Sequence, residues 1–183
     1  MVLFVNCCVR KESRTLRLAK DVLNHLGKPY KEVRVEDLGL KPLSEKDYEE
    51  RMRLVSEGRF DDSRLALSKE FSEAETIVIA APYWDMNFPS LLKLYLERVY
   101  VIGVVSSYND EGIPHGLCKG KKLYYVTTSG GPFDSRYSYD YIHELATQAF
   151  GIRETRLVVA SFLDVVGGDP DARLQEAIDA LAI

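Results

Sequence analysis

The sequence is poor in cysteine, and the positions of its few cysteines argue against both a disulfide bond and a bound metal ion. They are Cys7, Cys8 and Cys118. The adjacent pair could form a disulfide only through a strained ring, and none of the three stands at metal-ligand spacing from a histidine. We therefore expect reduced thiols and no metal site. The simplest interpretation of Cys7 and Cys8 is that they are small apolar residues at the end of a buried strand.

Targeting signals and long apolar runs are also lacking. The chain starts with the apolar run MVLFVNC, which has neither a basic start nor a small-residue cleavage site. No segment is long enough to cross a bilayer. These features lead us to expect a cytoplasmic protein with no membrane partner.

Charge of one sign is not concentrated anywhere in the sequence. The 24 basic and 28 acidic residues give a net charge of −4, and the basic residues are scattered among the acidic ones. This argues against nucleic acid as a partner and favours a small-molecule site. With 183 residues, 46% of them hydrophobic, the chain can bury about 70% of its unfolded surface around one core. We expect a single domain over residues 1–183.

Five short segments rich in β-branched or aromatic residues are predicted to be strands. They are Val2–Cys7, Tyr30–Val35, Thr76–Ala81, Lys122–Thr128 and Arg156–Ser161. Three of them are apolar almost without alternation. This pattern is typical of strands covered on both faces and favours a parallel sheet.

Apolar residues at helical spacing lie between the predicted strands. Residues 13–26 have Ser13 as a candidate N-cap and end at Gly27. Further helices are predicted at 89–101, 139–150 and 171–181, and two polar helical stretches at 44–73. The charged segment 37–64 suggests no function. The order of elements predicts a doubly wound α/β sandwich, with a five-stranded parallel sheet in the order 2-1-3-4-5 and helices on both faces.

In such a fold, ligands bind beyond the carboxyl ends of the strands, at the point where strand order reverses. The loop after the first strand, residues 8–15, ends in hydroxyls and free amides at a helix N-terminus, where the helix dipole favours an anion. It lacks the glycines of a dinucleotide fingerprint or a P-loop. We interpret it as a phosphate site, and the alternative is an ordinary N-cap among solvated charges.

Two further loops converge on the same edge of the predicted sheet. Residues 81–89 place the aromatic rings of Tyr83 and Trp84, a carboxylate and a thioether between a strand and a helix, which is a platform for a flat ring. The aromatic residues could instead pack into the core. Residues 127–132 include paired glycines that allow close backbone approach and offer amide donors, although a plain turn has the same pattern. Together the three loops predict a pocket for a phosphorylated planar cofactor.

The stretch 80–93, AAPYWDMNFPSLLK, is similar to the flavin-ring loop of a known family. With the Ser13-Arg14-Thr15 helix start, the Gly130-Gly131 loop and Phe150-Gly151-Ile152, it gives a resemblance over nearly the whole chain. The chain resembles the flavodoxin-like NAD(P)H dehydrogenase (quinone) and FMN-dependent NADH-azoreductase family. The resemblance implies FMN as cofactor, NADH or NADPH as co-substrate, quinones, azo compounds or similar acceptors, and a homodimer in which each chain completes the partner's pocket.

The resemblance also implies roles for particular residues. The phosphate would be held by Ser13, Thr15 and the Arg14 amide, with Cys8 at a position usually filled by serine. The isoalloxazine ring would be lined by Pro82, Tyr83, Trp84, Asp85 and Met86, and its other edge closed by Thr128, Ser129, Gly130 and Gly131. No catalytic side chain is required, because hydride passes through the flavin in a two-electron ping-pong cycle.

The chain departs from the family pattern at two positions. Asp85 stands where asparagine is common, and the aromatic residue expected near Ser106 or Ser107 is missing. Asp85 could lower the reduction potential of the flavin, or it could cap the helix that begins near Phe88. His115 could donate a proton or be a solvated loop residue. The alternative functions are a one-electron carrier of flavodoxin type and a flavin-binding sensor without turnover.

Overall fold

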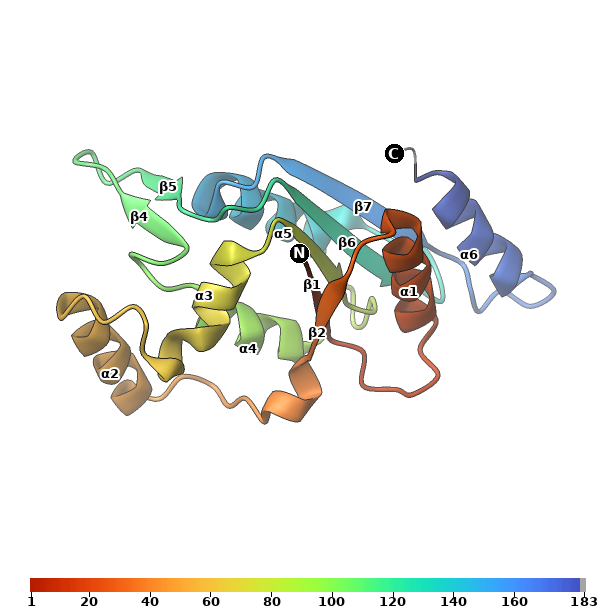
Figure 1. Ribbon diagram of the computed structural model, residues 1–183. Coiled ribbons are helices and arrows are strands. Elements are labelled where there is room, and N and C mark those ends of the chain that lie inside the picture. The colour runs from red at the N-terminus through yellow and green to blue at the C-terminus, as the bar shows by residue number, and fades with distance from the viewer. Residues whose placement is uncertain (182–183) are drawn as a thin grey trace.

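One parallel sheet dominates residues 1–181, which are the residues that the computed structural model describes. Its strands run in the order β2-β1-β3-β6-β7 (Figure 1). Their bounds are β1 Val2–Asn6, β2 Tyr30–Arg34, β3 Thr76–Ala80, β6 Lys122–Thr128 and β7 Glu154–Ala160. The predicted five-stranded order 2-1-3-4-5 is therefore confirmed, with strand ends shifted by one or two residues.

The apolar residues of the central strands pack into two hydrophobic cores, one on each face of the sheet. In β1, Leu3 and Val5 belong to the core cluster on one face of the sheet, and Val2 and Phe4 belong to the cluster on the other face. Every residue of β1 and β3 is buried, whereas β2 and β7 lie at the sheet edges and have exposed positions. Continuous apolarity therefore predicted the inner strands correctly.

Helices cover both faces of the sheet, as predicted. The helices α1 (Arg14–Leu26) and α6 (Pro170–Asp179) pack on one face. The other face carries α3 (Ala66–Glu73), α4 (Ser90–Val99) and α5 (Tyr139–Glu144) (Figure 1). None of the helices in residues 1–181 is long and apolar enough to cross a membrane.

The predicted helix over 139–150 changes its winding halfway. The α-helical part ends at Glu144, and residues Leu145–Phe150 form a π-helical turn. Thr147 donates its hydroxyl hydrogen to the carbonyl of His143 at 2.9 Å, a side-chain bond that competes with the regular helical ladder. Gly151, with φ 77°, then ends the helix in the left-handed conformation.

A short antiparallel hairpin that the sequence did not predict projects from the body of the molecule (Figure 1). It consists of β4 (Ser106–Tyr108) and β5 (Pro114–Gly116). A Cβ atom at Gly116 would lie 1.9 Å from the carbonyl carbon of Phe150, so only glycine allows this close approach to the rest of the chain.

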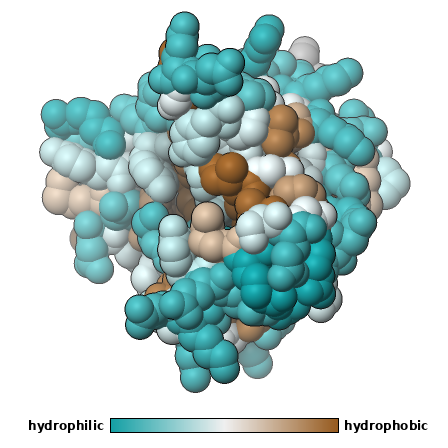
Figure 2. All heavy atoms as spheres, turned by 90° about the vertical axis from the view of Figure 1, so that its left-hand side faces the viewer, coloured by the Kyte–Doolittle hydropathy of each residue, from teal (hydrophilic) through white to brown (hydrophobic). Residues whose placement is uncertain are grey.

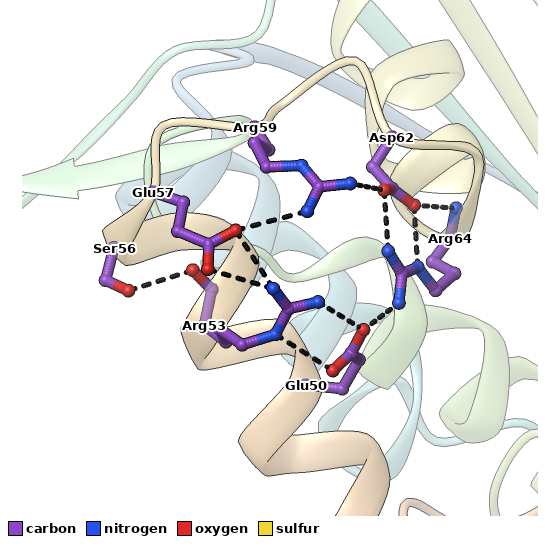
Figure 3. A network of polar contacts seen from close by, with 7 residues as sticks. All are labelled: Glu50, Arg53, Ser56, Glu57, Arg59, Asp62 and Arg64. Atoms are coloured by element: carbon purple, nitrogen blue, oxygen red, sulfur yellow. Dashed lines mark hydrogen bonds and ion pairs between the residues drawn. The ribbon is translucent and has the colours of Figure 1, made fainter.

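The charged segment 37–64 forms an outer layer of the molecule, which is held together by ion pairs. It contains the end of a 3-10 turn (Val35–Leu38), the helix α2 (Glu45–Ser56) and the start of a second 3-10 turn (Ser63–Leu65). A closed ring of three carboxylates and three guanidinium groups joins α2 to the chain before α3 (Figure 3). Its members are Glu50, Arg53, Glu57, Arg59, Asp62 and Arg64. Because most of these side chains are substantially exposed, each pair stabilises the layer only modestly.

Candidate functional site

A cavity of about 310 Å³ opens at the carboxyl ends of the central strands. Four loops line it, and three of them are the loops in which the sequence predicted a site. The lining residues are Val9, Arg10, Ser13, Arg14, Thr15, Pro82, Tyr83, Trp84, Thr128, Ser129, Gly130, Leu163 and Asp164. The volume is at the lower end of the range for ligand pockets, which is about 300 to 1,000 Å³.

One end of the cavity is suited to an anion. Ser13 is the N-cap of α1, and its Oγ accepts a hydrogen bond from the N–H of Leu16 at 3.2 Å. Its hydroxyl hydrogen can donate either to the neighbouring Cys8 thiol or to a ligand. Within residues 1–181, the backbone N–H groups of Arg14 and Thr15 have no hydrogen-bond acceptor. With no acidic residue in the first turn of α1, this end has donors and positive potential for a phosphate.

Thr15 and Thr128 share a hydrogen bond beneath the cavity. Their Oγ1 atoms are 2.6 Å apart, and both residues are buried. One hydroxyl must donate to the other, so the pair keeps a single hydrogen that can point to a ligand. The predicted phosphate contact of Thr15 and the predicted flavin contact of Thr128 therefore compete for one donor.

Cys8 does not line the cavity. It is 4% exposed and belongs to the core cluster between the sheet and helices α1 and α6. Burial raises the pKa of its thiol to about 11, so the side chain is neutral and a weak donor at neutral pH. Cys7 is likewise buried, and the cysteines are free thiols as expected.

The ring end of the cavity is built around a tight reverse turn. Trp84 and Asn87 exchange two backbone hydrogen bonds of 2.7 Å each, and between them Asp85 and Met86 have φ values of 49° and 65°. Two consecutive residues with positive φ in a two-residue loop define a type I′ turn, for which glycine and asparagine are favoured. Aspartate is also favoured in such turns, whereas holding Met86 there costs about 1–2 kcal/mol, and strain of this kind often marks a functional loop.

The turn projects its tip into solvent. Pro82, Tyr83 and Trp84 line the cavity, whereas Asp85 and Met86 are exposed and lie beyond its edge in a single chain. Trp84 is 39% exposed, so the alternative in which it packs into the core is wrong. Tyr83 is fixed by an edge-to-face contact with Phe133 at 4.9 Å between ring centroids.

The interpretation of Asp85 as a helix cap is also wrong. Helix α4 begins at Ser90 with Pro89 as its N-cap, and no side chain caps it. Asp85 therefore caps no helix, and it lies exposed at the tip of the turn.

The loop after β6 is held in a fixed shape. The Ser129 hydroxyl donates to the carbonyl of Gly131 at 2.8 Å, and its backbone N–H donates to the carbonyl of Ala160 at 3.0 Å. Thr128, Ser129 and Gly130 reach the cavity, and Gly131 lies next to it without lining it.

Leu163 and Asp164, which follow β7, also line the cavity, and the sequence reasoning missed them. The loop after the last strand ends at the same edge of a parallel sheet as the three loops that were considered, and this was the available signal. His115 lies elsewhere: it is on the hairpin, where Ser107 Oγ is 2.6 Å from its Nε2.

The cavity fits a group with an anionic end and a flat end. Arg10, Ser13 and the α1 amides gather at one end, and Tyr83 and Trp84 lie at the other. The backbone N–H of Gly130, which has no acceptor within residues 1–181, offers a further donor at the cavity wall. These donors match FMN, whose phosphate and planar ring are joined by a hydroxylated chain.

Comparisons with known proteins show the family to which the chain is similar. A family model described as "Flavodoxin-like fold" matches residues 1–182. A protein of Clostridium acetobutylicum named FMN-dependent NADH:quinone oxidoreductase 2 is 32% identical over 97% of this chain and 94% of its own length. A protein of Coprothermobacter proteolyticus named FMN-dependent NADH:quinone oxidoreductase is 29% identical, over 92% of this chain and 88% of its own.

A solved structure shares the fold at lower identity. An FMN-dependent NADH-azoreductase from Bacillus anthracis, in complex with FMN, superposes with a TM-score of 0.81 at 20% identity, over 98% of this chain and 94% of that one. At this identity the likeness shows the arrangement of the sheet and helices alone.

Proposed function

This chain belongs to the family of proteins with the flavodoxin-like fold, and we propose that it is an FMN-dependent NADH:quinone oxidoreductase. The observation that carries the proposal is the cavity in which an anion-binding helix start and an aromatic turn face a common space. Relatives that match nearly the whole chain bear the same activity in their names.

FMN, when bound, supplies the hydride chemistry, and the protein supplies binding, orientation and electrostatics. Ser13 and the amides of Arg14 and Thr15 anchor the phosphate. Tyr83 and Trp84 present flat faces to the ring, and the rigid loop at Ser129 limits its position. No general acid is assigned, because His115 lies outside the cavity.

The ring end of the cavity is open, and this suits an enzyme whose two substrates use one place in turn. The aromatic turn is exposed at Trp84 and Met86, so a nicotinamide and then an acceptor can reach the same face of the cofactor. We propose two-electron ping-pong transfer from NADH to quinones, with azo compounds as further acceptors.

We further propose that the active form is a homodimer in the cytoplasm. An apolar excess in residues 91–102, larger than one helix face needs for its own sheet, is a further reason to expect a dimer. Four of its residues, Leu92, Tyr95, Leu96 and Val99, are buried in the chain's own core, whereas Leu91, Tyr100 and Ile102 are half-buried. Other surfaces are available: a second cavity of about 470 Å³ beside the aromatic turn is lined partly by Phe88, Tyr137 and Tyr141.

The hairpin end of the molecule offers a second apolar surface. Figure 2 shows an apolar patch within a mostly hydrophilic face, on the side that carries α2 and the hairpin. The hairpin exposes Tyr108, Ile113 and Leu117 at its tip and base. Exposed apolar groups of this kind often mark an interface. Light scattering of the purified protein should report twice the mass of one chain, and a fully active monomer would contradict the dimer.

Steady-state kinetics test the proposed activity. Purified protein loaded with FMN should oxidise NADH in the presence of a simple quinone, with parallel lines in double-reciprocal plots when both substrates are varied. Failure to bind FMN, or binding without NADH oxidation, would contradict the proposal. The second outcome would favour a flavin-binding module without turnover.

A further inference from the structure

Asp164 places a carboxylate in the wall of the cofactor cavity, beside the proposed phosphate end. Its Oδ1 lies 2.6 Å from Nη1 of Arg14, and the same nitrogen donates a hydrogen bond to the carbonyl of Leu163 at 3.2 Å. Arg14 and Asp164 both line the cavity. The guanidinium group is therefore already paired in a pocket whose proposed ligand is an anion.

The backbone fixes the position of this carboxylate. Three successive N–H groups, those of residues 162, 163 and 164, donate to carbonyls of residues 131, 129 and 130 at 3.0 to 3.1 Å. A Cβ atom at Gly130 would lie only 2.1 Å from Oδ2 of Asp164, so the carboxylate packs directly against the Gly130 backbone. Asp164 is held at the cavity by the same loop that is proposed to contact the flavin.

The charged residues that line the cavity, two basic and one acidic, leave it a net charge of +1. Among the lining residues in the described part of the chain, Arg10 and Arg14 are the basic ones and Asp164 is the acidic one. A phosphate monoester carries a charge of about −1.5 to −2 at neutral pH. The Asp164 carboxylate both neutralises Arg14 and repels such a group.

We propose that Asp164 limits the affinity of this pocket for FMN, because its carboxylate competes with the cofactor phosphate for the guanidinium group of Arg14. The inference rests on the proposed function. Riboflavin has the same ring without a phosphate, so the competition lowers the preference for FMN over riboflavin. Asp164 thereby acts as a specificity-determining residue that sets the preference between the phosphorylated and the unphosphorylated flavin.

The exposure of the pair allows Arg14 to change partners. The side chain of Arg14 is 41% exposed and that of Asp164 is 69% exposed. An ion pair in such surroundings is weak, so a doubly charged phosphate can displace the carboxylate. The effect of removing the carboxylate should accordingly be moderate and sensitive to salt.

Equilibrium titration of the flavin-free full-length chain tests the proposal, with flavin fluorescence as the readout. At low ionic strength, Asp164→Asn should tighten FMN binding about fivefold, a change expected for a largely exposed charge pair. Riboflavin binding should stay within about twofold, and the gain for FMN should shrink at high salt.

The chain provides a matched control pair. Arg17 and Asp171 form an ion pair of the same length, 2.6 Å, from the next turn of α1 to α6, and neither residue lines the cavity. Asp171→Asn should leave both flavin affinities unchanged. In an Arg14→Met background, Asp164→Asn should lose most of its effect on FMN, because the contested guanidinium is gone.

Three results would overturn the proposal. Weaker FMN binding in Asp164→Asn would make the carboxylate a ligand of the flavin. Equal changes for FMN and riboflavin would place its effect away from the phosphate. No change would show that the carboxylate and the phosphate do not compete for Arg14. The proposed function fails separately, when the unaltered chain binds no FMN or does not oxidise NADH with it.

Discussion

Ser13 has two roles in this account, and substitution can separate them. Its Oγ accepts from the N–H of Leu16 and so caps α1, while its hydroxyl hydrogen is proposed to bond the phosphate. In Ser13→Ala both are lost. Loss of the cap should cost about 1 kcal/mol of unfolding free energy, which for a chain of this length lowers Tm by about 2–4 °C. Loss of a hydrogen bond to a charged group should cost about 1.5–3 kcal/mol of FMN binding, or roughly tenfold to a hundredfold in Kd.

Two further variants make the assay decisive. Ser44 caps α2 in the same way, with its Oγ 3.2 Å from the N–H of Asp47, and it does not line the cavity. Ser44→Ala should therefore lower Tm without altering the FMN Kd measured by fluorescence titration. Ser13→Asp keeps a good cap but places a carboxylate against the phosphate, so it should preserve Tm and abolish tight binding. Equal effects of Ser13→Ala and Ser44→Ala on both quantities would refute the phosphate role.

Further predictions concern the strained turn and the buried thiols. Asp85→Asn should raise the flavin midpoint potential by about 10 to 20 mV in spectroelectrochemical titration, because it removes a solvent-screened charge beyond the cavity edge that opposes the reduced flavin, and an unchanged midpoint would contradict this. Met86→Gly should raise the free energy of unfolding, measured in urea, by about 0.5–1 kcal/mol. The strain energy that the left-handed Met86 loses in the folded state is larger than the extra entropic cost of ordering a glycine. A decrease would argue against the type I′ turn. Burial raises the pKa of Cys8 to about 11 and that of Cys118 to about 12, above the ordinary value near 9. The contribution of these two thiols to the free energy of unfolding is complete below about pH 9. It is lost as the pH rises from there towards their pKa values in the folded protein, by about 1.4 kcal/mol per pH unit for each thiol. Urea unfolding at pH 8 and pH 10.5 should show this fall, Cys118→Ala should reduce it, and a pH-independent free energy would contradict it.

The parts of the fold that local chemistry determines could be predicted from the sequence. The apolar runs of β1 and β3 indicated strands buried on both faces, and Ser13 and Gly27 marked both ends of α1. The hairpin β4–β5 was missed because its strands have three residues each, too few to show a period.

Contacts between distant segments could not be predicted in the same way. The hydroxyl pair of Thr15 and Thr128 joins residues 113 positions apart, and Arg14 meets Asp164 across 150 positions. No spacing rule links such residues, because the fold alone brings them together.

Anaerobic spectroscopy of the two half-reactions tests the central claim most directly. FMN bound to the purified protein should lose its oxidised-flavin absorbance on addition of one equivalent of NADH, and one equivalent of a quinone should restore it. Reduction and reoxidation in these proportions would establish two-electron transfer through the bound cofactor. If NADH leaves the bound flavin oxidised, or the reduced flavin does not react with the quinone, the protein is not an NADH:quinone oxidoreductase.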